Sequence, residues 1–377
     1  MDWTFNLPVK LEFGIGKRKN LKSYIDSIGG TKGVLVCDGI FADNGVADDF
    51  VEMSEGALVA VFSDIRPNPT TANVNACVKV MREVGADFAV ALGGGSSMDC
   101  CKAACAIAKG SSDIEPYHFK EKEISADEVI PMIAVATTSG TASEVTNIAV
   151  LTNTDVSLKR PMNNPAMYAK IAVIDPELTL SVPPRVTAST GLDVLAHAVE
   201  SFWARDYQPV CSACSLHSAR LVFKWLEKAY NEPSNLEARE KMAEASIVAG
   251  VAFSHPRTTS SHACSFPLTN LYHVPHGEAC AFTLDYFMRL IAERGDEDGR
   301  VLGFARDCGF ASIEAMADEI TALKKRMGMR TTLSEIGCTT EEEIRNITKI
   351  SISEALIKNF PLDLTEEDIY NMYVVLK

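Results

Sequence analysis

The feature that most constrains the fold of this chain is an alternation of short apolar runs with stretches of helix length. The apolar runs occupy residues 33–37, 58–62, 88–92, 132–136 and 171–174, and intervening segments such as 71–84 and 98–109 have helical patterns. Strands that alternate with helices are typical of βαβ units, whose parallel strands are buried on both faces. The first half therefore predicts an α/β domain with a mostly parallel sheet.

The pattern changes at the proline pair Pro183-Pro184, after which long helical patterns follow and no convincing strand runs. Small and apolar residues recur at helical spacing on one face over 242–252. We therefore predict an α/β domain over 1–184 and an all-helical domain over 185–377. The residues on that face are Met242, Ala245, Ala249 and Ala252. Two later helices are predicted to begin with capping pairs, Thr340 with Glu343 and Thr365 with Asp368.

Charge and cysteine content limit the classes of partner. The 377 residues carry 36 basic and 50 acidic side chains, a net charge of −14 that argues against nonspecific nucleic-acid binding. No apolar run approaches the ~18 residues that a membrane span needs. The 11 cysteines are too few for a disulfide scaffold and odd in number, so we expect reduced thiols in a soluble, cytoplasmic protein.

Four of the seven histidines fall within residues 255–276, and a carboxylate–imidazole pair precedes them. Asp193 and His197 are four residues apart, so on a helix they project from one face. That pair alone is more typical of an ordinary surface pair. His262 and His276 strengthen the interpretation, because Pro275 and Gly277 flank His276 with turn-forming residues. Three imidazoles and one carboxylate suit Fe(II), Zn(II) or Ni(II) rather than an alkaline earth ion.

A second pattern favours a bound nucleotide. The run 88–92 leads directly into Gly93-Gly94-Gly95-Ser96 and a helix, an order that offers backbone amides to a phosphate. A second loop, Thr137 to Thr141, also follows a strand. Asp38 closes the run 33–37, where a carboxylate can accept ribose hydroxyls and repel a 2′-phosphate. It precedes the glycines instead of following them, so either the sheet is wound differently from the ordinary dinucleotide fold or Asp38 caps the next turn.

Together these motifs resemble the iron-containing (group III) alcohol dehydrogenase family over nearly the whole chain. The resemblance implies a dinucleotide-binding α/β domain followed by a helical domain, the dehydroquinate synthase-like architecture. The matching stretches are Arg66 to Thr70, Gly93 to Asp99, Thr137 to Thr146, Asp175 to Leu178, Gly191 to His197, and Pro275 to Gly277.

The resemblance also implies the site residues. The metal ligands would be Asp193, His197, His262 and His276, with Fe(II) as the first candidate ion and Zn(II) as the second. An aspartate at position 38 goes with NAD(H) in the family, and homo-oligomers, dimers or larger, are the rule. The NAD(H) site would comprise Asp38, Asn68, Gly94, Gly95, Ser96, Asp99, Thr137, Thr138, Thr141 and Lys159.

Two departures from the family pattern concern the substrate. Phe266 replaces a second histidine that most members carry, which leaves water, the cofactor ribose or His273 as proton relays. The usual glycine-rich segment before the third ligand is replaced by residues 255–261, which carry Arg257 and several hydroxyls. Guanidinium and hydroxyl donors suit phosphonate or sulfonate oxygens, although Arg257 could equally form a structural ion pair.

The expected function is therefore a metal-dependent, NAD(H)-linked alcohol dehydrogenase or aldehyde reductase acting on a short aldehyde. The pattern resembles the branch that reduces sulfoacetaldehyde or phosphonoacetaldehyde, with Arg257 and His273 as the candidate catalytic residues. The first alternative is a simple alcohol, 1,3-diol or glycerol dehydrogenase on the same fold. The second is a nucleotide-sensing or scaffold protein without turnover, and its only support is that Phe266 replaces the second histidine of the family.

Overall fold

The computed structural model describes residues 2–156 and 158–377. Tertiary contacts divide the chain into two compact units. The α/β unit consists of Asn6–Thr138 and Ala142–Thr179, and the helical unit consists of Leu180–Lys377 with Ser139–Thr141 and the start of the chain up to Phe5. The boundary predicted between residues 184 and 185 falls in the first turn of helix α7 (Pro184–Trp203).

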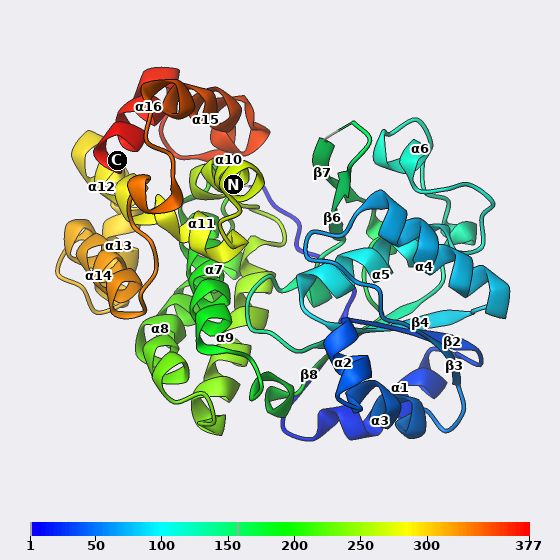
Figure 1. Cartoon of the computed structure of the whole chain (residues 1–377). Helices are drawn as coiled ribbons and strands as arrows, with labels where there is room; N and C mark the ends of the chain where they lie inside the picture. The colour runs from blue at the N-terminus through cyan, green and yellow to red at the C-terminus, as the bar shows by residue number, and fades with distance from the viewer. Residues whose placement is uncertain (1, 157) are drawn as a thin grey trace. The chain divides into compact units, whose positions relative to one another are not determined.

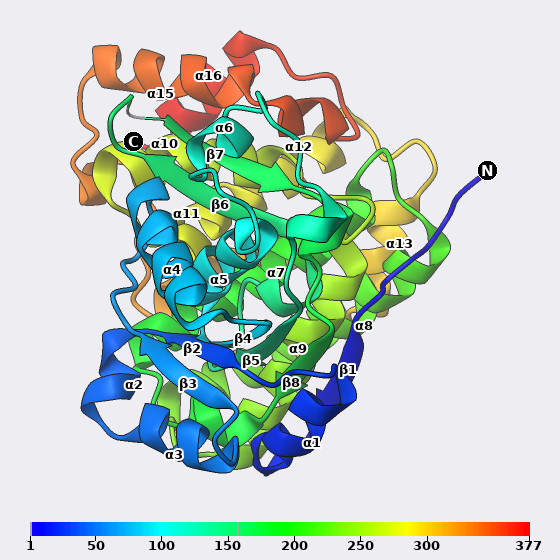
Figure 2. The ribbon, with the colours of Figure 1, turned by 90° about the vertical axis from the view of Figure 1, so that its right-hand side faces the viewer.

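The α/β unit contains a six-stranded sheet in the order β1-β8-β5-β4-β2-β3, and every neighbouring pair is parallel (Figure 2). The register places Val34 of β2 opposite Ala89 of β4, and Ala91 of β4 opposite Ala134 of β5. The predicted parallel sheet is therefore confirmed. The strands are β1 (Lys10–Phe13), β2 (Gly33–Cys37), β3 (Leu58–Phe62), β4 (Phe88–Gly93), β5 (Met132–Ala136) and β8 (Ile171–Ile174).

Helices cover both faces of this sheet, as Figures 1 and 2 show. One face carries α1 (Leu21–Ser27), α2 (Gly39–Asp43) and α3 (Val46–Met53), and the other carries α4 (Thr71–Val84) and α5 (Gly95–Ile107). Alternate strand side chains point to opposite faces. Large strand side chains such as Leu35, Val90 and Ile133 pack with Ile25 of α1 and Phe50 of α3 on the face that these helices cover.

Three strands were not predicted from the sequence. Strand β1 lies at a sheet edge and is half-exposed, and β6 (Ile148–Asn153) pairs with β7 (Leu158–Asn163) in a separate antiparallel sheet. β6 alternates half-buried with buried residues, and β7 contains Pro161. These strands lack the continuous apolar runs by which the central strands are recognised. The short elements of this unit are η1 (Lys17–Asn20), α6 (Glu115–His118), η2 (Ala126–Glu128), η3 (Ser143–Val145), η4 (Pro165–Met167) and η5 (Pro176–Thr179).

The helical unit is built around α7, which is buried over most of its length from Thr187 to Trp203 and packs against helices α8, α9 and α11 (Figure 1). A helix that is apolar all round must be covered on every side. The other elements are α8 (Pro209–Asn231), α9 (Leu236–Phe253), α10 (Ser260–Tyr272), α11 (His276–Phe282), α12 (Leu284–Arg294), α13 (Arg300–Asp307), α14 (Ile313–Arg326), η6 (Ser334–Ile336), α15 (Glu341–Ser353), η7 (Ala355–Asn359) and α16 (Glu366–Val375).

The sequence patterns of the helical unit are confirmed in detail. The predicted apolar face on α9 is buried at all four positions. Thr340 with Glu343 forms the capping box that opens α15, and Thr365 with Asp368 forms the one that opens α16. The helical domain is therefore confirmed. None of the helices in the described residues is long and apolar enough to cross a membrane, and the 11 cysteines are free.

Candidate metal centre and glycine-rich loop

Helix α7 presents two predicted ligands on one face. Asp193 Oδ1 lies 3.9 Å from His197 Nε2, and the two residues are only 2% and 5% exposed. Burial raises the pKa of Asp193 to about 6. Burial and the neighbouring imidazoles lower the pKa of His197 well below its usual value, so this ring is neutral. A neutral imidazole is the form that binds a metal.

Two further imidazoles meet the same carboxylate oxygen. Nε2 of His262, on α10, lies 3.6 Å from Asp193 Oδ1, and Nε2 of His276, the first residue of α11, lies 3.9 Å from it. Donors bound at ~2.1 Å to one tetrahedral ion are about 3.4 Å apart, so these distances fit a single ion with little adjustment. The structure thus places the three predicted imidazoles around Asp193 Oδ1.

The unsatisfied atoms of this cluster also fit a metal ion. Asp193 Oδ1 and His262 Nε2 are buried and have no hydrogen-bond partner among the described residues. Buried polar atoms are normally paired, because leaving one unpaired costs roughly 1–3 kcal/mol. An N3O donor set suits a borderline divalent ion such as Fe(II) or Zn(II).

Glu200 holds His262 in place, a role that the sequence reasoning missed. Its Oε1 accepts hydrogen bonds from the N–H groups of Thr259 (3.1 Å) and Ser261 (2.8 Å) and from the Thr259 hydroxyl (2.9 Å). Its Oε2 pairs with His262 Nδ1. A carboxylate on Nδ1 places the proton there and leaves Nε2 free for a metal. The available signal was spacing, because Glu200 lies seven residues after Asp193, two turns along the same helix.

Helix α11 is fixed by close packing against α7 and by an ion pair to Arg330, which follows α14. A Cβ atom on Gly277 would lie 2.0 Å from the Ser189 carbonyl oxygen, so only glycine permits this approach. The Glu278 N–H donates to Ser189 Oγ at 3.1 Å. The buried Glu278 carboxylate accepts from Arg330 Nε (2.7 Å) and Nη2 (2.9 Å), and this guanidinium lowers the Glu278 pKa against the effect of burial. These contacts determine where His276 lies.

The set of donor atoms that lie close to one another includes Cys280, which was not predicted as a ligand, and does not include the predicted ligand His197. Asp193, His262, His276 and Cys280 offer donor atoms that all lie within 4.8 Å of one another. The sequence pattern gave no ligand role to Cys280. His273 ends α10 with a left-handed backbone (φ 54°) and is not part of this cluster.

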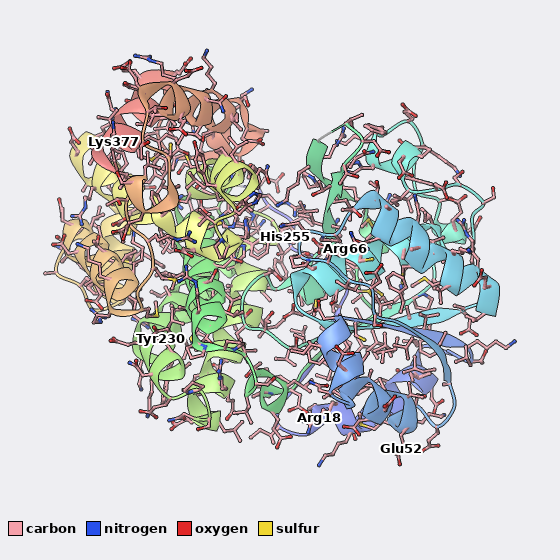
Figure 3. All side chains as sticks on the ribbon, viewed as in Figure 1. Arg18, Glu52, Arg66, Tyr230, His255 and Lys377 are labelled. Carbon is pink, nitrogen blue, oxygen red and sulfur yellow. The ribbon has the colours of Figure 1, made fainter. Side chains whose placement is uncertain are left out.

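Arg257 lies in the loop that connects α9 to α10, two residues after His255, which Figure 3 labels. Its backbone is left-handed (φ 67°), and Asn359 Nδ2 clamps the loop by donating to the carbonyls of Pro256 (2.6 Å) and Thr258 (3.4 Å). Burial and the charge of Arg257 lower the pKa of His255. No described carboxylate forms an ion pair with the half-buried Arg257 guanidinium, so the structural ion pair considered from the sequence is not formed.

In the α/β unit, the predicted glycine turn joins β4 to α5. A Cβ atom on Gly93 (φ 153°) would lie 2.4 Å from Ser97 Oγ, and one on Gly94 would lie 3.0 Å from Thr138 Oγ1. No side chain of the described residues caps α5, whose first residues are Gly95 and Ser96. The turn therefore leaves backbone amides for a phosphate.

Asp38 lies beside this turn, because β2 and β4 are neighbours in the sheet. Its Oδ2 accepts a hydrogen bond from Ser97 Oγ at 2.9 Å, and burial raises its pKa. The sheet order β5-β4-β2-β3 explains how Asp38 can precede the glycines in the sequence and still lie beside them, and its side chain makes no capping hydrogen bond to α2.

The other predicted nucleotide-binding residues are distributed over three places. Thr137 and Thr138 follow β5, next to the glycine turn, and the Thr137 N–H donates to the Gly93 carbonyl at 3.1 Å. Lys159 Nζ donates to Asn68 Oδ1 at 2.9 Å, so these two residues are joined to each other although both are distant in sequence from that turn. Asp99 accepts from Ser143 Oγ (2.7 Å) and from the Val150 N–H (2.9 Å), contacts that tie α5 to η3 and β6. Thr141 belongs to the short segment that groups with the helical unit.

A parallel α/β unit with an open glycine turn, followed by a helical unit that gathers three histidines around one buried aspartate, is the arrangement expected of a metal-dependent, nucleotide-linked enzyme. The family model described as iron-containing alcohol dehydrogenase matches residues 8–176, and the model of the family's C-terminal domain matches residues 187–375. The chain therefore belongs to the iron-containing alcohol dehydrogenase family.

Individual relatives span most or all of the chain. A crystal structure of sulfoacetaldehyde reductase from Bifidobacterium kashiwanohense in complex with NAD+ is 46% identical, covers 100% of this chain and 99% of its own, and has a TM-score of 0.96. The 1,3-propanediol dehydrogenase of Klebsiella pneumoniae is 36% identical over 79% of this chain and 78% of its own. The NAD-dependent methanol dehydrogenase of Bacillus methanolicus is 30% identical over 97% of both chains.

Proposed function

We propose that this protein is an NAD(H)-linked, metal-dependent reductase of a short aldehyde that carries a sulfonate or phosphonate group. The observation that carries the proposal is Arg257, a half-buried cation without a carboxylate partner among the described residues, five positions before the metal ligand His262. The similarity to a sulfoacetaldehyde reductase supports the same substrate class.

The helical unit would hold the ion through Asp193, His197, His262 and His276, with Fe(II) as the first candidate and Zn(II) as the second. When bound, the ion supplies a Lewis acid for the carbonyl oxygen, and the reduced nicotinamide supplies the hydride. Glu200 keeps the His262 Nδ1 proton in place. His273, water or the cofactor ribose would return the proton to the product oxygen.

The α/β unit would hold NAD(H). The amides of Gly94, Gly95 and Ser96 at the start of α5 suit the pyrophosphate, and the Asp38 carboxylate suits the adenosine ribose hydroxyls and repels a 2′-phosphate. We therefore infer a preference for NAD(H) over NADP(H). The remaining contacts would come from Thr137, Thr138, Thr141, Asn68 and Lys159, while both Asp99 oxygens are already used inside the protein.

The loop 255–261 would bind the anionic end of the substrate. The Arg257 guanidinium can donate two parallel hydrogen bonds to a sulfonate or phosphonate. The hydroxyls of Ser260 and Ser261 are buried and without hydrogen-bond partners among the described residues, so further donors are close in sequence. A left-handed arginine costs about 1 kcal/mol, and such strain persists where function requires it.

The test compares charged with uncharged aldehydes in the enzyme reconstituted anaerobically with Fe(II), by following NADH absorbance. Replacing Arg257 by Ala removes a charge-assisted hydrogen bond worth ~1.5–3 kcal/mol, so kcat/KM for sulfoacetaldehyde should fall ~10–100-fold, chiefly through KM. Propanal should be affected far less. The control is Arg220→Ala, on the exposed face of α8, where the guanidinium donates to the Asp307 carbonyl.

Equal losses for sulfoacetaldehyde and propanal would remove Arg257 from substrate recognition. The alternative of a simple alcohol or 1,3-diol dehydrogenase, favoured by the similarity to a propanediol and a methanol dehydrogenase, predicts that Arg257→Ala leaves the preference among aldehydes unchanged. Binding of metal and NADH without turnover of any aldehyde would instead favour the nucleotide-sensing alternative. We place the reaction in the cytoplasm and expect a homo-oligomer.

A further inference from the structure

Cys280 lies on the same helix as a proposed metal ligand, one turn after it. His276 and Cys280 are four residues apart on α11, the same spacing that Asp193 and His197 have on α7. The Cys280 Sγ lies 3.6 Å from His276 Nε2, and the residue is completely buried. Each of the two helices thus presents a pair of potential ligands to one place.

The sulfur occupies a position that a metal–thiolate bond would require. Its distances to the donor atoms of Asp193, His262 and His276 are all within 4.8 Å. A tetrahedral ion with a sulfur at ~2.3 Å and a nitrogen at ~2.05 Å separates these two donors by about 3.6 Å. The observed 3.6 Å between Cys280 Sγ and His276 Nε2 agrees with that value.

A second observation points to a ligand here. Asp193 Oδ1 and His262 Nε2, which face the same place, are buried and have no hydrogen-bond partner among the described residues. Asp193, His262, His276 and Cys280 together form an SN2O set, whereas exchange of Cys280 for His197 forms the N3O set described above. The two sets share Asp193, His262 and His276, and they differ in whether the fourth donor is a soft thiolate or an imidazole.

We propose that the Cys280 thiolate is a further ligand of the metal centre, beside Asp193, His262 and His276, and strengthens its binding of borderline divalent ions such as Fe(II), Zn(II) or Co(II). On binding, the thiol loses its proton to solvent and a metal–sulfur bond forms without oxidation or reduction. A second negative ligand beside Asp193 neutralises a divalent ion completely. A soft thiolate favours such ions over Mg(II). The proposal rests on the metal centre of the proposed function but not on its substrate.

The test uses the full chain, stripped of metal by a chelator and reloaded anaerobically with one equivalent of Co(II). A thiolate bound to Co(II) gives an intense charge-transfer band in the near ultraviolet, which nitrogen and oxygen ligands do not give. We expect this band in the parent protein and its loss in Cys280→Ser. The matched control is Cys264→Ser, an equally buried thiol on α10 outside the donor cluster, which should retain the band.

Co(II) bound at one equivalent without the band, or with a band that survives in Cys280→Ser, would overturn the proposal and leave a plain thiol–imidazole contact. If the serine variant fails to fold, X-ray absorption of the zinc-loaded parent decides, because a sulfur neighbour at ~2.3 Å is required. The affinity for Zn(II), measured by competition with a chromogenic chelator, should fall at least ~10-fold in Cys280→Ser. Absence of NADH oxidation would contradict the proposed function alone, since these spectra need no turnover.

Discussion

At the scale of single residues, the metal centre depends on the protonation and orientation of imidazoles as much as on their positions. Glu200 shows why. It is completely buried, it accepts four hydrogen bonds on one oxygen, and its other oxygen holds His262 Nδ1. The ring is therefore oriented, and its Nε2 is the atom available to a metal. A neutral side chain of the same shape cannot reproduce both halves of this arrangement.

Replacing Glu200 by Gln should weaken metal binding ~10–100-fold. Because Gln must keep its carbonyl toward the Thr259 and Ser261 N–H groups, its NH2 group faces His262 Nδ1 and forces the proton onto Nε2. Affinity for Zn(II) or Fe(II) is measured by competition with a chromogenic chelator. The control is Glu244→Gln, whose carboxylate contacts His217 at 2.8 Å away from the centre. Unchanged affinity in Glu200→Gln would contradict the orienting role.

The same scale shows what spacing in the sequence reveals. Asp193 and His197 were recognisable because i, i+4 spacing places two side chains on one face of a helix. Cys280 has this relation to His276, and Glu200 has the corresponding two-turn relation to Asp193, yet neither was predicted as part of the centre. Spacing identifies residues that share a face, but only packing between α7, α10 and α11 shows that these faces meet.

At the scale of elements, sequence patterns predicted best those strands that consist of a continuous apolar run, including the half-exposed edge strand β3. The runs 33–37, 58–62, 132–136 and 171–174 coincide with β2, β3, β5 and β8, and the run 88–92 with β4 apart from its last residue. β1, β6 and β7 were missed because polar residues or proline interrupt their apolar runs. The position of Asp38 beside the glycine turn likewise follows from strand order, which no local pattern encodes.

The connection between β5 and β6 contains a buried carboxylate that makes the α/β unit sensitive to pH. Glu144 in η3 is 3% exposed, and burial raises its pKa to about 7. Lys102 on α5 counteracts this effect in part, and burial lowers the pKa of Lys102 itself. The Lys102 Nζ lies 3.7 Å from Asp99 and donates to the Ile148 carbonyl at 2.6 Å, so it keeps partners if Glu144 is neutralised.

Glu144→Gln should therefore stabilise the protein at pH 8 but not at pH 4.5. The folded state binds the Glu144 proton more tightly than the unfolded state, so stability falls as pH rises from 4.5 toward 7 and then stays constant. A pKa shift of this size corresponds to about 3 kcal/mol. Thermal unfolding across this pH range measures the difference, with Glu83→Gln on the exposed face of α4 as the charge-matched control. If Glu144→Gln changed the stability by the same amount at pH 4.5 and at pH 8, ionisation of Glu144 would not be the cause.

At the scale of the whole molecule, the two units divide the chemistry between them. All four predicted metal ligands belong to the helical unit, and most predicted NAD(H) contacts belong to the α/β unit. A ligand that binds only the folded state stabilises the part to which it binds, by ~2.7 kcal/mol at a concentration one hundred times its Kd. The metal ion and NADH should therefore each slow hydrogen exchange in a different part of the chain.

Hydrogen exchange measured by mass spectrometry on the full chain tests this division. Zn(II) added to the metal-free protein should slow exchange in peptides from α7, α10 and α11, where up to ~100-fold protection corresponds to the stabilisation above. NADH alone should slow exchange in peptides that span Asp38 and the turn from β4 to α5. Mg(II), which prefers more oxygen ligands, is the control and should protect neither set. If Zn(II) slowed exchange only in the turn after β4 and left α7 unchanged, the cluster of aspartate and histidines would not be the metal centre. Asp193 and His197 lie on α7, so metal binding to them must slow exchange in that helix.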